Sequence, residues 1–152
     1  MKKEVEFLKK TASELLNLMS VNGDVDVSFD KQGESFLVNI KSEEETGLLI
    51  GKKGETLSSL QTVLSLILKQ ETGEWKRVVV NIGDYREKEE DYLKNLAEST
   101  AARAVESGQP QNLYNLKAWQ RRIVHLYLSE NKNVETESTG EGQERYLIVR
   151  PK

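Results

Sequence analysis

The feature that most constrains this chain is a segment rich in glycine and lysine, 47–54, between a strand pattern and a helix pattern. Within it, Gly51 and Gly54 bracket Lys52 and Lys53. Glycines allow the backbone to turn tightly and to approach a ligand closely. A helix that begins directly after such a loop points its unpaired N–H groups and its positive dipole end toward the loop. The segment therefore predicts an anion site that suits a phosphate group.

Apolar periodicity around this loop predicts the element order helix, strand, strand, short helix, loop, helix, strand. The helices are expected at 2–20, 44–50 and 55–71, and the strands at 24–30, 35–41 and 75–82. The first two strands alternate strictly between apolar and polar residues and are separated by a short turn, which is typical of a hairpin. The first half of the chain therefore predicts one mixed α+β unit.

A domain boundary is expected at Gly83 and Asp84, which gives domains 1–83 and 84–152. Asp84 and Glu87 have the spacing of a capping box, and the helix that follows is expected to run to about residue 107. An extended segment at 110–115 then leads to a helix at 116–130, with Asn115 as its predicted cap. Two strands, 134–138 and 145–150, complete a second, small α/β unit.

The charge of the chain limits how it can bind a polyanion. Its 152 residues carry a net charge of −3, so nucleic-acid binding needs local basic patches rather than bulk attraction. Acidic residues are absent from two windows, 46–54 and 107–129. The sequence contains no cysteine, which excludes disulfides and thiolate metal sites and is compatible with a reducing cytosol. It also shows no signal peptide and no apolar run long enough for a membrane span.

The second window places a basic cluster on the helix predicted at 116–130. At 100° per residue, an apolar core face is expected from Leu116, Trp119, Ile123 and Tyr127. The opposite face carries the candidate ligand-binding side chains, with Arg122 intermediate: Lys117, Arg121, Arg122 and His125. A guanidinium and an imidazole can together hold a phosphate. The alternative is an ordinary solvated helix face, because charged residues usually occupy such positions.

The glycine loop also has alternatives. Its glycines could simply end one helix and begin the next. The segment is not a nucleotide P-loop, because three residues rather than four separate Gly47 from Gly51, and Lys53 stands where Ser or Thr would bind magnesium. With a single histidine and no cysteine, the chain offers no credible nucleophile, metal cluster or acid–base pair. We therefore expect no enzymatic activity, no cofactor and no metal.

The segment Ile50–Gly54, placed between two helices and after a hairpin, resembles the G-x-x-G loop of a type II KH domain. Residues Arg121 and His125 match the Arg-x-x-x-His signature of the R-three-H domain, and residues 83–86 resemble the junction between the two domains. Together these motifs are similar to the Jag (KhpB) family of bacterial RNA-binding proteins. Members often carry a further N-terminal domain, and we expect none before Met1 in the sequence given.

The resemblance implies a cytosolic, non-enzymatic protein that binds single-stranded RNA. Its RNA-binding residues would be Ile50, Gly51, Lys52, Lys53, Gly54, Arg121 and His125, with Lys117 and Arg122 added from helix geometry. A Gly51→Asp/Gly54→Asp variant is expected to lose binding at the loop. The family also implies a role in cell elongation, cell-wall control or sporulation, and a small KH-domain partner. Single-stranded DNA as a second ligand, a homodimer, and a protein-interaction module in which RNA is secondary all stay open.

Overall fold

The computed structural model describes residues 1–152, which form two compact units, Met1–Arg86 and Glu87–Lys152. The first unit contains α1 (Lys2–Leu18), β1 (Asp24–Asp30), β2 (Ser35–Lys41), α2 (Thr46–Ile50), the short 3-10 helix η1 (Lys52–Gly54), α3 (Glu55–Thr72) and β3 (Arg77–Ile82). The predicted α+β class and the order helix, strand, strand, helix, helix, strand are therefore confirmed. None of the helices combines the length and apolar character that a membrane span requires.

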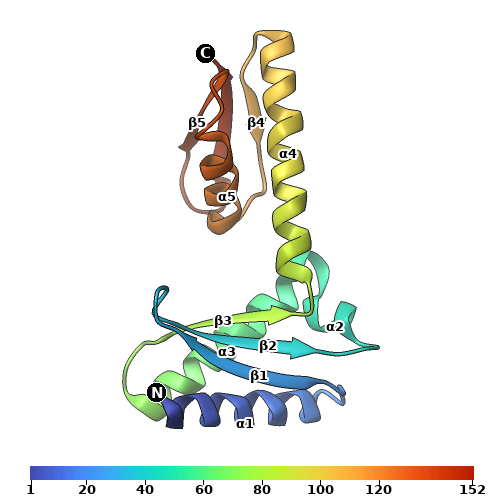
Figure 1. The fold of residues 1–152 in the computed structure, drawn as a ribbon, viewed down its shortest axis with the longest axis vertical. Helices are drawn as coiled ribbons and strands as arrows, with labels where there is room; N and C mark the ends of the chain where they lie inside the picture. The colour runs from blue at the N-terminus through green and yellow to red at the C-terminus, as the bar shows by residue number, and fades with distance from the viewer. The chain divides into compact units, whose positions relative to one another are not determined.

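The sheet of the first unit has the order β1-β2-β3, with β2 antiparallel to β1 and parallel to β3 (Figure 1). Its register aligns apolar side chains in rows across the strands, such as Val27, Val38 and Val80. These three are buried, while their neighbours along each strand point to the other, more exposed face. Helices α1 and α3 supply the rest of this core through Leu8, Leu16, Leu60, Leu64 and Leu68. Strict alternation made these strands predictable, because one face of the sheet is covered and the other is not.

The outer edge of β3 is closed by side chains rather than by another strand. The Val80 N–H donates to Gln61 Oε1 at 3.1 Å. Arg86 donates from Nε and Nη2 to the Val80 carbonyl at 3.2 and 3.1 Å. Since both backbone groups of Val80 are occupied, an additional strand cannot extend the ladder there without displacing these bonds.

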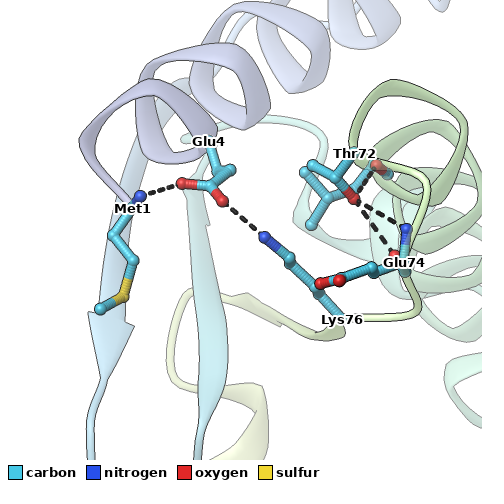
Figure 2. A network of polar contacts seen from close by, with 6 residues as sticks. Met1, Glu4, Thr72, Glu74 and Lys76 are labelled. Carbon is cyan, nitrogen blue, oxygen red and sulfur yellow. Dashed lines mark hydrogen bonds and ion pairs between the residues drawn. The ribbon is translucent and has the colours of Figure 1, made fainter.

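A polar cluster joins the start of α1 to the segment before β3 (Figure 2). Lys76 Nζ lies 2.5 Å from Glu4 Oε1, and the Met1 amino group pairs with the other carboxylate oxygen. The hydrogen bond from Lys76, followed by that from the Met1 amino group, lowers the pKa of Glu4 from its ordinary 4.5 to about 2. The carboxylate is thus favoured in its charged form when the chain is folded.

This cluster predicts acid-sensitive stability. The folded pKa is lowered, so the contribution of Glu4 is present above about pH 4.5 and is lost as the pH falls toward 2. We expect Glu4→Gln to lower the urea midpoint at pH 7 and to have a smaller effect at pH 3. Glu6→Gln, on an exposed residue of the same helix, is the control. A Glu4→Gln effect that is equal at both pH values would contradict the ion-pair origin of the stabilisation.

The second unit contains most of α4 (Tyr85–Ser107), β4 (Gln111–Leu113), α5 (Ala118–Leu128), β5 (Val134–Thr139), the 3-10 helix η2 (Gly142–Glu144) and β6 (Tyr146–Pro151). Its antiparallel sheet has the order β4-β6-β5 (Figure 1). The core is formed by the apolar stripe of α4, by α5 and by one face of this sheet: Leu93, Ala97, Ala101, Ala104, Leu113, Val124, Leu128, Val134, Leu147 and Val149.

The start and the orientation of α5 differ from the sequence prediction. The helix begins at Ala118, and Asn115 does not cap it but adopts a left-handed backbone with φ of 59°. Gln120 Oε1 instead accepts the Lys117 N–H at 2.7 Å, which is half of a capping box. The predicted core face is only half right. Leu116 and Ile123 pack against the core, but its buried centre is Val124 and Leu128, whereas Trp119 is 40% and Tyr127 37% exposed. The sheet selects the aliphatic stripe and leaves the aromatic residues at the surface.

Candidate nucleic-acid interface

The glycine loop links α2 to α3 through three residues with positive φ. Gly51 has φ 71° and ψ −177°, Lys53 has φ 52°, and Gly54 has φ 73°. The Gly51 combination is open almost only to glycine, since a Cβ would clash with the backbone. Helix α3 begins at the next residue, Glu55. The loop therefore lies at a helix N-terminus, as its sequence predicted.

Side chains below the loop explain why glycine occupies both positions. A Cβ on Gly51 would lie 2.2 Å from Thr56 Oγ1 and 2.9 Å from the Thr56 backbone nitrogen. A Cβ on Gly54 would lie 2.8 Å from the Tyr85 hydroxyl. From the sequence, the glycines were explained by the close approach of a ligand. The contacts with Thr56 and Tyr85, which also require glycine, were not predicted. Tyr85 is distant in sequence, and only the tertiary structure brings it to the loop.

The exposed surface of the loop provides donors for an anion. Lys52 and Lys53 are exposed and form no ion pair. The Gly51 and Gly54 amides donate to carbonyls within the segment, whereas those of Lys52 and Lys53 make no backbone hydrogen bond. Adjacent unpaired amides beside left-handed residues form a concavity that favours anions. Two ammonium groups and two backbone amides can thus bind one or two phosphate groups.

The apolar residues of α2 divide between the core and the surface. Leu49 is fully buried and Ile50, a predicted contact residue, is half-buried against the core. Leu48, two residues before Ile50, is 59% exposed. Leu48 is therefore an apolar side chain beside the loop that sequence reasoning did not select. Three consecutive apolar residues at 48–50 do not show which of them is exposed, because this depends on how α2 is rotated about its own axis against the core.

The basic cluster of the second unit is only partly as predicted. Lys117 precedes α5 in an extended conformation and so does not share its helical face. Arg122 is exposed, on the far side of the helix from buried Val124. Arg121 and His125 lie four residues apart on one flank of α5, and His125 there faces β5, with its Nδ1 2.5 Å from Thr136 Oγ1. Arg121 and His125 thus share one flank of α5, Arg122 lies three residues before His125 on the more exposed side, and Lys117 precedes the helix.

Arg121 is anchored by backbone carbonyls. Its Nη1 donates to the Leu116 carbonyl at 2.6 Å and to the Arg145 carbonyl at 3.4 Å. Arg145 in turn donates from Nε to Ser138 Oγ at 2.8 Å. Both bonds of Arg121 use Nη1, so its Nη2 and Nε remain for an external acceptor. Arg145 was not selected from the sequence, since it lies far from the 107–129 window and joins the cluster only when β5 and β6 pair.

Comparison with known proteins agrees with this arrangement. The family model of the KhpA/KhpB KH domain matches residues 5–82, and that of the R-three-H domain matches residues 91–151. The chain is 31% identical over 147 residues to the RNA-binding protein KhpB of Clostridium symbiosum, which covers 97% of this chain and 64% of that protein. It is 32% identical over 132 residues to RNA-binding protein KhpB of Bacillus subtilis, with coverage of 86% and 63%.

A third relative, RNA-binding protein KhpB of Lactiplantibacillus plantarum, is 32% identical over 131 residues, with coverage of 86% of this chain and 40% of that protein. The chain thus spans less than two thirds of the length of each of these relatives. Matches to both domain models, in the order observed in the fold, account for most of its residues. On this evidence the chain belongs to the KhpB (Jag) family, in which a KH domain precedes an R-three-H domain.

Proposed function

We propose that the chain binds single-stranded RNA without catalysing a reaction, through the glycine loop and through the Arg121/His125 flank. The observation that carries this proposal is the loop, where two exposed lysines and two unpaired amides lie at the N-terminus of α3. The name RNA-binding protein KhpB, borne by the relatives, supports RNA as the ligand. In a KH domain such a loop grips the sugar-phosphate backbone of about four nucleotides.

In this proposal, the two sites bind different parts of the RNA strand. Lys52, Lys53 and their amides neutralise and hydrogen-bond phosphates, while Leu48 and Ile50 offer apolar surface to bases. Arg121 and His125 hold a second part of the strand, together with Lys117 and Arg122 where the strand extends beyond the flank. Two weak sites on one chain raise the overall affinity, because the second contact becomes intramolecular. Family membership supports a cytosolic regulator of cell elongation, cell-wall control or sporulation.

The second site is tested by fluorescence anisotropy with a labelled, mixed-sequence single-stranded RNA. We expect Arg121→Ala/His125→Ala to raise Kd about 10- to 150-fold, since a hydrogen bond to a charged group is worth roughly 1.5–3 kcal/mol. The control is Arg103→Ala/Lys132→Ala, which removes two exposed cations of the same unit. Unchanged affinity of the first variant, with an unchanged melting temperature, would remove this site from the proposal.

A second candidate function is association with a partner, either a small KH-domain protein or another copy of this chain. Exposed apolar side chains on α3 favour it, since Val63 is 40% and Leu66 49% exposed and they are three residues apart. Strand addition at β3 is disfavoured by the bonds from Gln61 and Arg86. Sedimentation velocity of wild type and of Val63→Ser/Leu66→Ser distinguishes this candidate, which requires a complex that the variant loses.

A further inference from the structure

Two tyrosines lie next to each other on the outer face of the second sheet. Leu113 pairs with Leu147 between β4 and β6, and both point into the core. The residues beside this pair, Tyr114 and Tyr146, therefore point to the opposite face. Their rings are 4.9 Å apart between centroids, at an interplanar angle of 40°. Tyr114 is 58% exposed, so part of the pair is open to solvent.

Arg121 connects this aromatic pair to the basic flank. The Leu116 carbonyl that accepts its Nη1 is two residues beyond Tyr114, and the Arg145 carbonyl belongs to the peptide that leads into Tyr146. One guanidinium thus ties together the two segments that carry the tyrosines. Helix α5, which carries Arg121, covers the core face of this sheet, whereas the tyrosines lie on the opposite face. A strand that contacts both Arg121 and the tyrosines therefore passes around the end of the sheet where these two segments lie.

The nearest neighbours of the tyrosine pair on this face of the sheet are uncharged. Asn112 Nδ2 donates to the Tyr114 hydroxyl at 2.9 Å, which holds this ring in place. Ile148 follows on the same face of β6, and Arg150 there is already paired with Glu137 at 2.5 Å. Exposed aromatic rings on a sheet bind unpaired bases by stacking, and every base has a face that can stack.

From this arrangement we propose that Tyr114 and Tyr146 form a stacking platform for unpaired bases of the strand whose phosphates contact Arg121. The proposal rests on the proposed RNA binding and extends its second site from the helix flank onto the sheet. It assigns backbone contact to the flank and base contact to the tyrosines. The affinity of this unit then depends on the presence of bases as well as on charge.

The experiment compares two labelled strands of equal length, a mixed-sequence single-stranded RNA and an abasic oligonucleotide that keeps only the sugar-phosphate backbone. We expect Tyr114→Leu/Tyr146→Leu to weaken RNA binding about 5- to 50-fold and to leave binding of the abasic strand unchanged. Tyr114→Phe/Tyr146→Phe keeps the aromatic rings and is expected to bind RNA like wild type. This variant still tests the proposal if the leucine variant folds poorly. Tyr92→Leu removes an exposed tyrosine of α4 as a control.

Each outcome decides between the two proposals. Unchanged RNA affinity of the leucine variant overturns the stacking platform and leaves the proposed function standing. An equal loss on both strands also overturns it, because the tyrosines would then act through the fold. A large loss in the phenylalanine variant assigns the effect to the hydroxyl groups and likewise overturns stacking. Failure of wild type to bind RNA at all removes the proposed function itself.

Discussion

Reversing the charge of the glycine loop is expected to remove RNA binding by the first unit. In Lys52→Asp/Lys53→Asp, two attractive charges near phosphates become repulsive, and each such pair is worth about 1 kcal/mol even in bulk water. We expect Kd to rise by at least about 30-fold at physiological salt. The plot of log K against log salt should become shallower by about 1.4, since each phosphate contact with a single strand contributes about 0.7.

This variant is expected to leave the loop structure intact. Both lysines are exposed, and neither glycine is changed. Lys53 has a left-handed backbone, which aspartate tolerates better than most residues because its short polar side chain bonds locally. A Gly51→Asp/Gly54→Asp variant is less informative. Its new side chains meet Thr56 and Tyr85, so it changes the loop as well as its charge.

Lys9→Asp/Lys10→Asp is the matched control for charge. Both residues are exposed on α1, and the change in net charge is the same. We expect this control to bind RNA within about twofold of wild type, since exposed charges beyond a Debye length of about 8 Å are largely screened. If the loop variant and the control both bind RNA with the affinity of wild type, the loop does not hold the strand. If both bind RNA more weakly than wild type and to the same extent, the loss comes from the net charge of the protein rather than from the loop.

The second large effect is expected on stability, from Gly51→Ala. Alanine would have to adopt φ 71° with ψ −177°, and its Cβ would lie 2.9 Å from the Thr56 backbone nitrogen. We expect a loss of about 2–4 kcal/mol in the free energy of unfolding of the first unit, because both strain and displaced backbone contribute. RNA affinity should fall as well, since the amides of Lys52 and Lys53 would move.

Gly47→Ala provides the control within the same segment. Gly47 lies inside α2, and no atom lies within 4 Å of the position its Cβ would take. We expect this change to be neutral or to stabilise by up to about 1 kcal/mol, because alanine favours helix. Urea unfolding followed by Trp75 fluorescence in a Trp119→Phe background reports on the first unit alone. Similar midpoints for the two variants would show that the Gly51 conformation is not required.

Local pattern was sufficient for the sheet and the loop of the first unit. The strands predicted at 24–30 and 35–41 match β1 and β2, since strict alternation admits one register with the apolar face inward. The glycine loop could be located from the sequence because a backbone with positive φ favours glycine, and glycines can be read directly from the sequence. The helix predicted at 55–71 agrees with α3 to within one residue, because Gly54 and Gly73 bound it.

The orientation of α5 could not be predicted in the same way. Its residues offer two apolar stripes, one with Trp119 and Tyr127 and one with Val124 and Leu128. Apolar periodicity alone cannot decide which of two equally apolar stripes is buried. The larger size of Trp119 and Tyr127 favoured their stripe in the prediction, but the structure leaves these two residues exposed. The sheet buries the aliphatic stripe, which turns His125 toward β5 and brings Arg121 against the Arg145 carbonyl.

The sequence by itself determined the element order, the position of the glycine loop and the identity of Lys52, Lys53, Arg121 and His125 as candidates. These features depend on residues that are close in the chain, where backbone conformation and side-chain period act directly. Only the tertiary structure decided that Thr56 and Tyr85 support the glycines, that Arg145 joins Arg121, and that Tyr114 meets Tyr146. Most of these contacts join residues far apart in the chain, and strand pairing and helix packing bring them together.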